Sequence, residues 1–439
     1  MRSLVRAPIV LVLSTLLVAQ GKPASPRHRP GTTSPSAHKL LSINITGTKR
    51  YTPEEVIAAI GLEIGQQVTE QNFKQASQKL GETGAFTEIA YSYSYSSAGT
   101  KLEIQLADSD QLIPVYFDNL VWFSDQELRE GLRQHLPLFK NRLPVGGHLA
   151  DELADRLNTM LSERRVAGHV HYLRFSDSPE GPIQSFLYSA DGTDITIRNV
   201  DFPGASPSQL PILDDVAKKE IAEGEYLRSK LAAIAKVALR PIYLKQGYLK
   251  VAFGDAQPEL VSTLPKQTIV DVKLPVEEGR QYKVDQIVWT GNTVFPADKL
   301  RPLIHLDINQ PPNAVQLEDD FHAVEQLYGS RGYLKARVTS QPEFNDSDST
   351  VAYTLQVKEG DLYRLGEVDI EGLDEKAALR LREDWKLREG EPYDSSYPQR
   401  FFKDAAADMP ASARWNMKVD ESLNNKDKTV DVTLRFSPQ

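Results

Sequence analysis

The chain has 439 residues, with 51 Lys and Arg against 60 Asp and Glu, and a formal net charge of −9 at pH 7. It contains no cysteine, which excludes a disulfide framework and a lipid-modified N-terminal cysteine. The first 39 residues hold six basic and no acidic side chains, which leaves −15 on the residues that follow. An acidic body of this kind argues against nucleic acid as a ligand.

Residues 1–21 have the pattern of a secretory signal peptide. Two arginines precede or flank the start of an apolar run from Ile9 to Ala19, and Ala19-Gln20-Gly21 is a small-x-small cleavage pattern. The alternative, a transmembrane anchor, needs about 20 apolar residues, whereas this run has eleven and includes two hydroxyl residues. We therefore expect cleavage after export, and no integral membrane segment in the mature chain.

Residues 22–38 are rich in Pro, Ser and Thr and lack apolar periodicity. Such a segment cannot bury enough surface to offset its chain entropy, so it is predicted to be a disordered leader. Its basic residues allow contact with an anionic surface, but a solvated linker is the simpler interpretation.

The rest of the chain is predicted to form five units of about 80 residues, because the same succession of alternating strands and helical stripes returns along it. The units are expected at residues 39–110, 111–193, 194–280, 281–361 and 362–439. A unit of this size can hold a small sheet covered by two helices.

The first unit opens with a strand at residues 41–45 that ends at Gly47. Thr52 and Glu55 then have the spacing of a capping box at the start of a helix. A second helical stripe and two final strands are predicted at Phe73, Ala76 and Leu80, at residues 89–94 and at residues 102–106.

The second and third units are less regular. Ser124 to Glu127 can cap a helix in the second unit, and residues 200–204 predict a strand and turn in the third. Further helical faces are marked by Leu149, Leu153, Leu157 and Met160, and by Leu227, Leu231, Ile234 and Ala238. Pro241 falls inside the latter helix and is expected to kink it or end it one turn before Gly247.

The fourth unit is the most regular. Alternating apolar residues from Val284 to Trp289 predict a strand that ends at Gly291-Asn292, since Gly and Asn tolerate positive φ. Pro296 opens a short helix. The second helical stripe consists of Leu317, Phe321, Val324, Leu327 and Tyr328. Gly332 ends that helix, and strands are predicted at residues 333–338 and 351–357, with a turn at 345–348 between them.

The fifth unit keeps the strand and turn at residues 368–372 and the helical face of Phe401, Phe402 and Ala405. Pro410 to Trp415 stand where the fourth unit has Gly-Tyr-Leu, so the entry into its second strand is left open.

Short motifs recur between the units. Gly247-Tyr248-Leu249-Lys250 returns as Gly332-Tyr333-Leu334-Lys335, and Glu278-Gly279 returns as Glu359-Gly360. Twelve residues separate a closing glycine from the next turn glycine at 192 and 204, 279 and 291, and 360 and 372. Through these residues the chain resembles the polypeptide-transport-associated (POTRA) repeat of outer-membrane barrel-assembly and two-partner-secretion proteins.

The resemblance implies an α+β fold, a linear array of five β-α-α-β-β modules in which a three-stranded mixed sheet is covered by two helices. It also implies a periplasmic location in a Gram-negative-type envelope, with peripheral contact to the outer membrane. The implied role is outer-membrane protein assembly or secretion, with unfolded outer-membrane proteins or a separate β-barrel protein as partners.

The strand that follows Gly-Tyr-Leu should pair only with the third strand, which leaves one edge open for β-augmentation by an extended client. Each added hydrogen bond contributes about 1 kcal/mol net, whereas ordering a flexible guest costs about 1 to 2 kcal/mol per residue. One unit therefore binds weakly, and several in series gain avidity. The expected polypeptide-binding residues are Leu249, Lys250, Val251, Ala252, Phe253, Leu334, Lys335, Ala336, Arg337 and Val338.

No catalytic residue, metal site or cofactor is predicted. His169 and His171 would share one strand face, half of a metal site, but no third ligand is evident and an exposed pair is the simpler interpretation. Residues 345–348 resemble a calcium loop without its glycine at the sixth position. Glu278 and Glu359 recur at unit ends and are interpreted as strand terminators. No phosphate loop or nucleophile motif is present, so we expect a protein that is not an enzyme.

Two alternatives stay open. A structural spacer or docking protein of the envelope would use the same array, because five units of about 25 Å span on the order of 100 Å. Relatives of this architecture usually continue into a β-barrel of well over ~100 residues, whereas three residues follow the last predicted strand here. The sequence therefore predicts that this chain contains no barrel. The protein is then either a barrel-less array that acts on a separate barrel protein or the truncated arm of a barrel-assembly protein.

Overall fold

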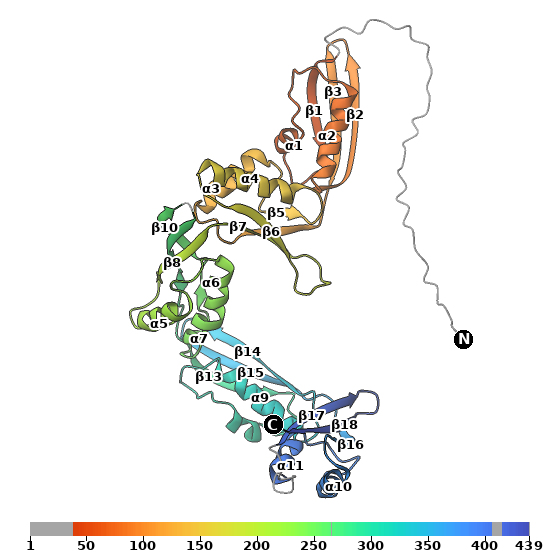
Figure 1. Ribbon diagram of the computed structural model, residues 1–439, viewed down its shortest axis with the longest axis vertical. Coiled ribbons are helices and arrows are strands. Elements are labelled where there is room, and N and C mark those ends of the chain that lie inside the picture. Colours follow the sequence, from red (N-terminus) through yellow and green to blue (C-terminus); the bar gives the residue numbers. More distant parts are fainter. Residues whose placement is uncertain (1–37, 265, 406–414, 439) are drawn as a thin grey trace, which may run out of the picture. The chain divides into compact units, whose positions relative to one another are not determined.

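The computed structural model describes residues 38–264, 266–405 and 415–438. The predicted signal peptide, nearly all of the predicted leader, and residues 410–414 at the unassigned strand entry lie outside these ranges. The chain divides into two compact units: one holds the described residues up to Leu112 together with Leu136–Ala150, and the other holds Ile113–His135 together with the residues from Asp151 onward. The fold is α+β, with helices and small mixed sheets in succession along the chain (Figure 1).

The first sheet lies in the first unit. Its elements are β1 (Leu40–Thr46), α1 (Pro53–Ile60), α2 (Glu70–Glu82), β2 (Phe86–Ser96) and β3 (Gly99–Asp108). The central strand β3 pairs in parallel with β1 and antiparallel with β2, and α2 lies across the sheet (Figure 1). The predicted capping box is confirmed, because the Glu55 amide donates to the Thr52 hydroxyl and the Thr52 amide donates to the Glu55 carboxylate. The predicted stripe of α2 is also confirmed, since Phe73, Ala76 and Leu80 are buried.

The next elements are β4 (Leu112–Phe117), α3 (Asp125–His135), β5 (Arg142–Pro144), α4 (Leu149–Glu163), β6 (His169–Phe175) and β7 (Ser185–Asp191). Strand β7 pairs in parallel with β4 and antiparallel with β6. The predicted helical face of α4 is buried at Leu149, Leu153, Leu157 and Met160.

The third group consists of β8 (Asp194–Asp201), α5 (Leu210–Glu220), α6 (Arg228–Ile234), the π-helix Ala235–Leu239, α7 (Arg240–Leu244), β9 (Ala252–Phe253), β10 (Gln257–Leu264), β11 (Gln267–Lys273) and β12 (Val276–Glu277). Strand β11 is central, parallel to β8 and antiparallel to β10, while β9 and β12 form a separate short pair.

Pro241 lies within a helical segment that continues past it to Leu244. The chain widens into the π-helix directly before α7, and Pro241 occupies the first turn of α7, which continues to Leu244. Because proline lacks an N–H and its ring collides with the carbonyl four residues earlier, a wider turn relieves the position without ending the helix. The expected disturbance therefore takes the form of a local widening.

The last two groups repeat one arrangement. The first comprises β13 (Lys283–Thr290), α8 (Ala297–Leu300), the 3-10 helix Arg301–Leu303, α9 (Gln316–Gly329), β14 (Arg337–Asn345) and β15 (Thr350–Lys358). The second comprises β16 (Arg364–Glu371), α10 (Glu375–Asp384), α11 (Tyr397–Ala405), β17 (Trp415–Asn424) and β18 (Thr429–Pro438). The strand orders are β13-β15-β14 and β16-β18-β17, so the last strand in sequence is central in both sheets.

The predicted stripe of α9 forms the core of its group. Leu317, Val324 and Tyr328 are buried together with residues of β13 and β15, and Phe321 and Leu327 are partly buried against them. The apolar residues of one helix face thus cover one face of the sheet.

Gly291 shows why the turn after the first strand needs glycine. Its φ is +75°, and a Cβ atom there would lie 2.2 Å from the carbonyl oxygen of Val357. A side chain is excluded by both conformation and space. The same close approach to the central strand occurs at Gly47 and Gly372, and Gly204 approaches the carbonyl oxygen of Val276 in β12 equally closely.

Throughout the described ranges, no helix combines the length and the apolarity that crossing a membrane would require.

Candidate polypeptide-binding surfaces

The strand order of the sheets leaves open edges. Among the described strands, β2, β10, β14 and β17 each pair only with the central strand of their sheet. The prediction that the strand after Gly-Tyr-Leu is an edge is therefore confirmed for β14, whereas in the third group the strand after Gly-Tyr-Leu is the short β9, which pairs with β12 outside the three-stranded sheet. The first strand of each group lies at the opposite side of the sheet, an edge that sequence reasoning left out.

The predicted binding residues do not all lie in these strands. Tyr333 to Ala336 form a turn, and β14 begins only at Arg337. In the third group β9 begins at Ala252, so Leu249, Lys250 and Val251 also precede the strand. The predicted strand start at Gly-Tyr-Leu is thus four residues too early, because an alternation of only four residues does not distinguish an extended strand from a turn that buries every second side chain.

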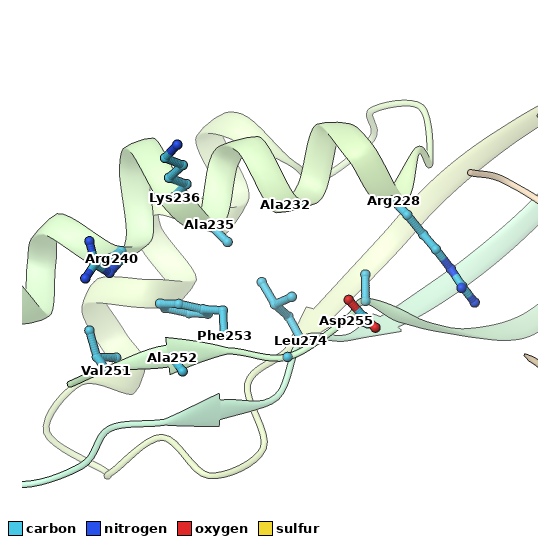
Figure 2. A pocket seen from close by; sticks show the side chains of 12 residues that line it. Arg228, Ala232, Ala235, Lys236, Arg240, Val251, Ala252, Phe253, Asp255 and Leu274 are labelled. Atoms are coloured by element: carbon cyan, nitrogen blue, oxygen red, sulfur yellow. The ribbon is translucent and has the colours of Figure 1, made fainter. Parts of the chain in front are cut away.

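Val251, Ala252 and Phe253 line a cavity of about 360 Å³. Figure 2 shows it between the helical segment from Arg228 to Arg240 and the strand that carries Phe253. Ala232, Ala235, Phe253 and Leu274 supply apolar lining, and Lys236, Arg240 and Asp255 are charged residues of the same lining.

Lys250 lies in a contact between two sheets. Its Nζ donates to Asp346 Oδ1 at 2.6 Å and lies 4.6 Å from the ring centre of Phe344. The Tyr282 hydroxyl donates to the same carboxylate oxygen at 2.5 Å. The hydrogen bond with Asp346 raises the pKa of Lys250, and the bond from Lys250 lowers the pKa of Asp346. We call Lys250, Tyr282 and Asp346 the first tyrosine joint.

Lys335 occupies the corresponding place one group later. The Tyr363 hydroxyl and the Lys335 ammonium both donate to Asn425 Oδ1, the former at 2.9 Å. The Lys335 nitrogen lies 5.6 Å from the centre of the Tyr363 ring. We call Lys335, Tyr363 and Asn425 the second tyrosine joint. The two lysines of the predicted binding set therefore connect neighbouring groups.

Glu359 is more than a strand terminator. Its carboxylate accepts hydrogen bonds from the Val294 amide at 2.7 Å and the Tyr328 hydroxyl at 2.9 Å. Burial raises the pKa of Glu359, but the hydrogen bonds outweigh this effect and hold that pKa below its usual value. Glu278 accepts in the same way from the Ser206 amide and the Tyr243 hydroxyl. Glu359 follows the central strand β15 and ties it to the first turn and to α9, whereas Glu278 follows β12 and ties it to the first turn and to α7.

The polar motifs have local partners. His171 Nε2 lies 3.2 Å from the Ser189 hydroxyl, and the Asn345 side chain accepts from the Ser347 and Asp348 amides within its own hairpin turn. No group of three or more His, Cys, Asp or Glu side chains is placed to hold a metal ion within residues 38–264, 266–405 and 415–438.

Sequence reasoning missed one strand edge with unusual composition. Residues 91–96 of β2 read Tyr-Ser-Tyr-Ser-Tyr-Ser. The strict alternation of one aromatic and one small polar residue is a signal visible in the sequence, although the first group lacks the Gly-Tyr-Leu motif.

Comparisons with known proteins find one matching family model and several similar proteins. The family model described as "Surface antigen variable number repeat" (POTRA) matches residues 282–360. Outer membrane protein assembly factor BamA of Buchnera aphidicola is 20% identical over 423 residues, which cover 91% of this chain and 64% of that protein. The Neisseria meningitidis protein of the same name is 23% identical over 261 residues, 55% of this chain and 32% of that one.

Among solved structures, POTRA3-5 of Haemophilus influenzae BamA matches with a TM-score of 0.41 and 23% identity, covering 55% of this chain and 95% of that one. The chain spans less than two thirds of the length of the curated relatives named above. Residues 282–360 are thus a POTRA domain, and the chain resembles outer-membrane protein assembly factors over most of its length.

Proposed function

We propose that this protein is a periplasmic scaffold that binds extended polypeptides by β-augmentation during outer-membrane protein assembly or secretion. The observation that carries the proposal is the repeated strand order, which leaves β2, β10, β14 and β17 paired on one side only among the described strands. A client strand can use the free backbone groups of such an edge. The names of the similar proteins, outer-membrane protein assembly factors, support the same role.

The proposal includes five POTRA-like repeats with boundaries near residues 110, 193, 280 and 361. Four sheets share one order, with the last strand in the centre, and β7 is likewise flanked by a parallel and an antiparallel strand. Weak binding at each repeat then adds up through effective concentration while release stays fast. Unfolded outer-membrane proteins or a separate β-barrel protein are the proposed partners, and we propose no catalytic activity or cofactor.

Photo-crosslinking tests this function. A photoreactive residue at Ala252 or Asp255, which line the cavity, or at Thr339 on β14, should capture an extended peptide added to the full-length protein. Asp319, exposed on α9, is the control position and should not capture it. Lys250 and Lys335 are poor probe positions, because both are engaged in the tyrosine joints. Equal capture at the strand and helix positions would contradict the proposal.

A second candidate is a rigid spacer that docks other envelope proteins. The two tyrosine joints favour it, because each fixes a lysine of one group against the first tyrosine and the hairpin turn of the next group. Distances between spin labels at Gln257 and Glu343 distinguish the candidates. A narrow distribution that is unchanged by peptide, together with no peptide capture, would favour the spacer.

A further inference from the structure

A row of partly exposed tyrosines runs along β2. Tyr91, Tyr93 and Tyr95 occupy every second position, so their rings share one face of the strand. Tyr93 packs 5.0 Å from Phe73 of α2 and 5.3 Å from Tyr95, measured between ring centres, and Tyr95 is 46% exposed. From Tyr91 to Tyr95 the row extends over about 14 Å at about 3.4 Å per residue. We call these three residues the tyrosine row.

A carboxylate stands beside the middle ring of the row. Glu70, the first residue of α2, is exposed. Burial raises the pKa of Tyr93, and the charge of Glu70 and its hydrogen bond with the tyrosine raise that pKa further. Lys74 is exposed one turn further along α2, and no ion pair joins it to Glu70 in the described part of the chain. A ligand that fits this face therefore needs a flat apolar surface together with a cation.

The described chain begins at this row. His38 is the first described residue, and its ring centre lies 5.7 Å from that of Tyr95 in an edge-to-face arrangement. The next carbonyl, that of Lys39, accepts a hydrogen bond from the amide of Thr100, the residue opposite Tyr95 on β3. The segment that precedes His38 in the sequence is thus attached to the first unit at one end of the tyrosine row.

The sequence of that segment has the chemistry that this face selects. Residues 23–30 read Pro-Ala-Ser-Pro-Arg-His-Arg-Pro. Polyproline II geometry has three residues per turn, so Pro23, Pro26 and Arg29 would share one face in it. Proline-rich segments dock against aromatic side chains at low entropy cost, and an arginine adds paired donors for a carboxylate.

We propose that residues 23–30 of the chain's own leader bind the tyrosine row, with Pro23 and Pro26 against the rings and Arg29 paired with Glu70. Nine residue steps separate Arg29 from His38, and they can span up to about 30 Å, which exceeds the length of the row. A short tether gives an effective concentration on the order of millimolar, so a weak contact is sufficient. The inference goes beyond the proposed function, since the protein covers these rings itself and any other ligand of the row has to displace the leader.

Trypsin provides the readout, because the leader offers it one bond. Trypsin cuts after lysine and arginine unless proline follows, and both Lys22 and Arg29 are followed by proline. This leaves the bond between Arg27 and His28. In the full chain after the predicted signal peptide, mass spectrometry at short digestion times should show this cleavage about tenfold slower than in a free peptide of residues 22–38. Equal rates in the protein and the peptide would overturn the proposal.

Two variants should release the leader. Glu70→Lys removes the carboxylate and Tyr95→Ser removes the most exposed ring, so each should raise the rate of cleavage after Arg27 toward that of the free peptide, while Tyr95→Phe should retain the protection. The matched controls are Glu54→Lys, in the first turn of α1, and Tyr116→Ser, 55% exposed on β4. Both controls should leave the rate unchanged. An unchanged rate in Glu70→Lys and Tyr95→Ser would place the leader elsewhere.

Exchanging the two charges separates a specific pair from general attraction between a basic leader and an acidic body. Arg29→Glu should expose the bond after Arg27, and Arg29→Glu combined with Glu70→Arg should protect it again, each rate being compared with that of a free peptide of the same sequence. If protection does not return in the double variant, the pairing of Arg29 with Glu70 is wrong. The assay contains no client peptide, so its failure leaves the proposed function standing.

Discussion

The two tyrosine joints have the same geometry and different charges. In each, a lysine and a buried tyrosine donate to the Asx residue of the next hairpin turn. That residue is Asp346 in the first joint and Asn425 in the second. Arg280, two residues before Tyr282, donates to the Asp346 carbonyl, whereas Asp361, two residues before Tyr363, pairs with Lys428 at 2.6 Å.

The comparison teaches which part of the joint is fixed. Both joints contain a tyrosine ring, a lysine ammonium group and a side-chain oxygen that accepts from them. The carboxylate belongs to Asp346 in the first joint and to Asp361 beside the second. Each joint keeps one carboxylate near its lysine. The shape of the contact is thus specified by the tyrosine and the turn, and the position of the negative charge is free to vary.

The largest effect is expected from removing a joint tyrosine. Tyr282 and Tyr363 are almost completely buried, so Tyr282→Ala and Tyr363→Ala should each destabilise the adjoining sheets by about 3 to 5 kcal/mol, the range for large buried aromatic side chains. Hydrogen exchange of the amides in β13 to β15 and in β16 to β18 measures the effect in the full-length protein. A loss restricted to one joint would contradict their equivalence.

The next effect concerns the glycine that closes each joint. Gly332 has a φ of +90°, and a Cβ there would lie 2.6 Å from the Tyr363 carbonyl oxygen. Gly332→Val should therefore cost about 1 to 3 kcal/mol, and Gly247→Val a similar amount, because Gly247 has a φ of +81°. Thermal unfolding followed by hydrogen exchange checks both variants. Unchanged protection of β14 and β15 in Gly332→Val would show that the turn tolerates a β-branched residue.

A smaller effect should distinguish the two joints by how their contribution to stability depends on pH. The pKa of Asp346 is lowered from 3.8 by the bond from Lys250, so its contribution to stability is complete above pH 3.8 and is lost as the pH falls through the lower folded value. The destabilisation caused by Tyr282→Phe should therefore shrink in acid. Tyr363→Phe should show no such change, since Asn425 does not titrate. Denaturant midpoints at pH 7 and pH 3 make the comparison, and an equal acid response of both variants would refute it.

The smallest effect is expected from exchanging the two Asx residues. Asp346→Asn removes the charge beside Lys250, but both side chains are exposed, where screening leaves an ion pair little net value. Asn425→Asp should change stability equally little. Melting curves in low and high salt measure the difference, and a large change in either variant would mean that the charge, rather than the turn, holds the joint.

Much of the fold was predictable where a long pattern has one interpretation. The stripe of α9 and the capping box of Thr52 and Glu55 were assigned correctly, because helical spacing over several turns and a four-residue cap are both local. The turn glycines were found through their twelve-residue spacing, and the structure gives the reason at Gly291, where the central strand approaches too closely for a side chain.

The binding surfaces were less predictable because they depend on contacts between distant residues. The Gly-Tyr-Leu motif resembles a strand start, yet Gly332 accepts a hydrogen bond from the Tyr363 amide and so belongs to a joint. The partners of Lys250 and Lys335 lie about 90 residues further along the chain, and no local pattern reveals them. The assignment of Leu249 to Phe253 and Leu334 to Val338 as binding residues stays a prediction.

The shared strand order also sets the time at which each sheet can form. In β13 the residue Lys283 pairs with Thr350 of the central β15, and β14 pairs with β15 as well, so neither outer strand has a sheet partner until the last strand of its group is available. If the chain crosses a narrow export channel with its N-terminus first, the strands of each group stay unpaired until nearly all of that group has crossed. Folding would then proceed in discrete steps, one sheet after another, with at most one incomplete sheet exposed at a time.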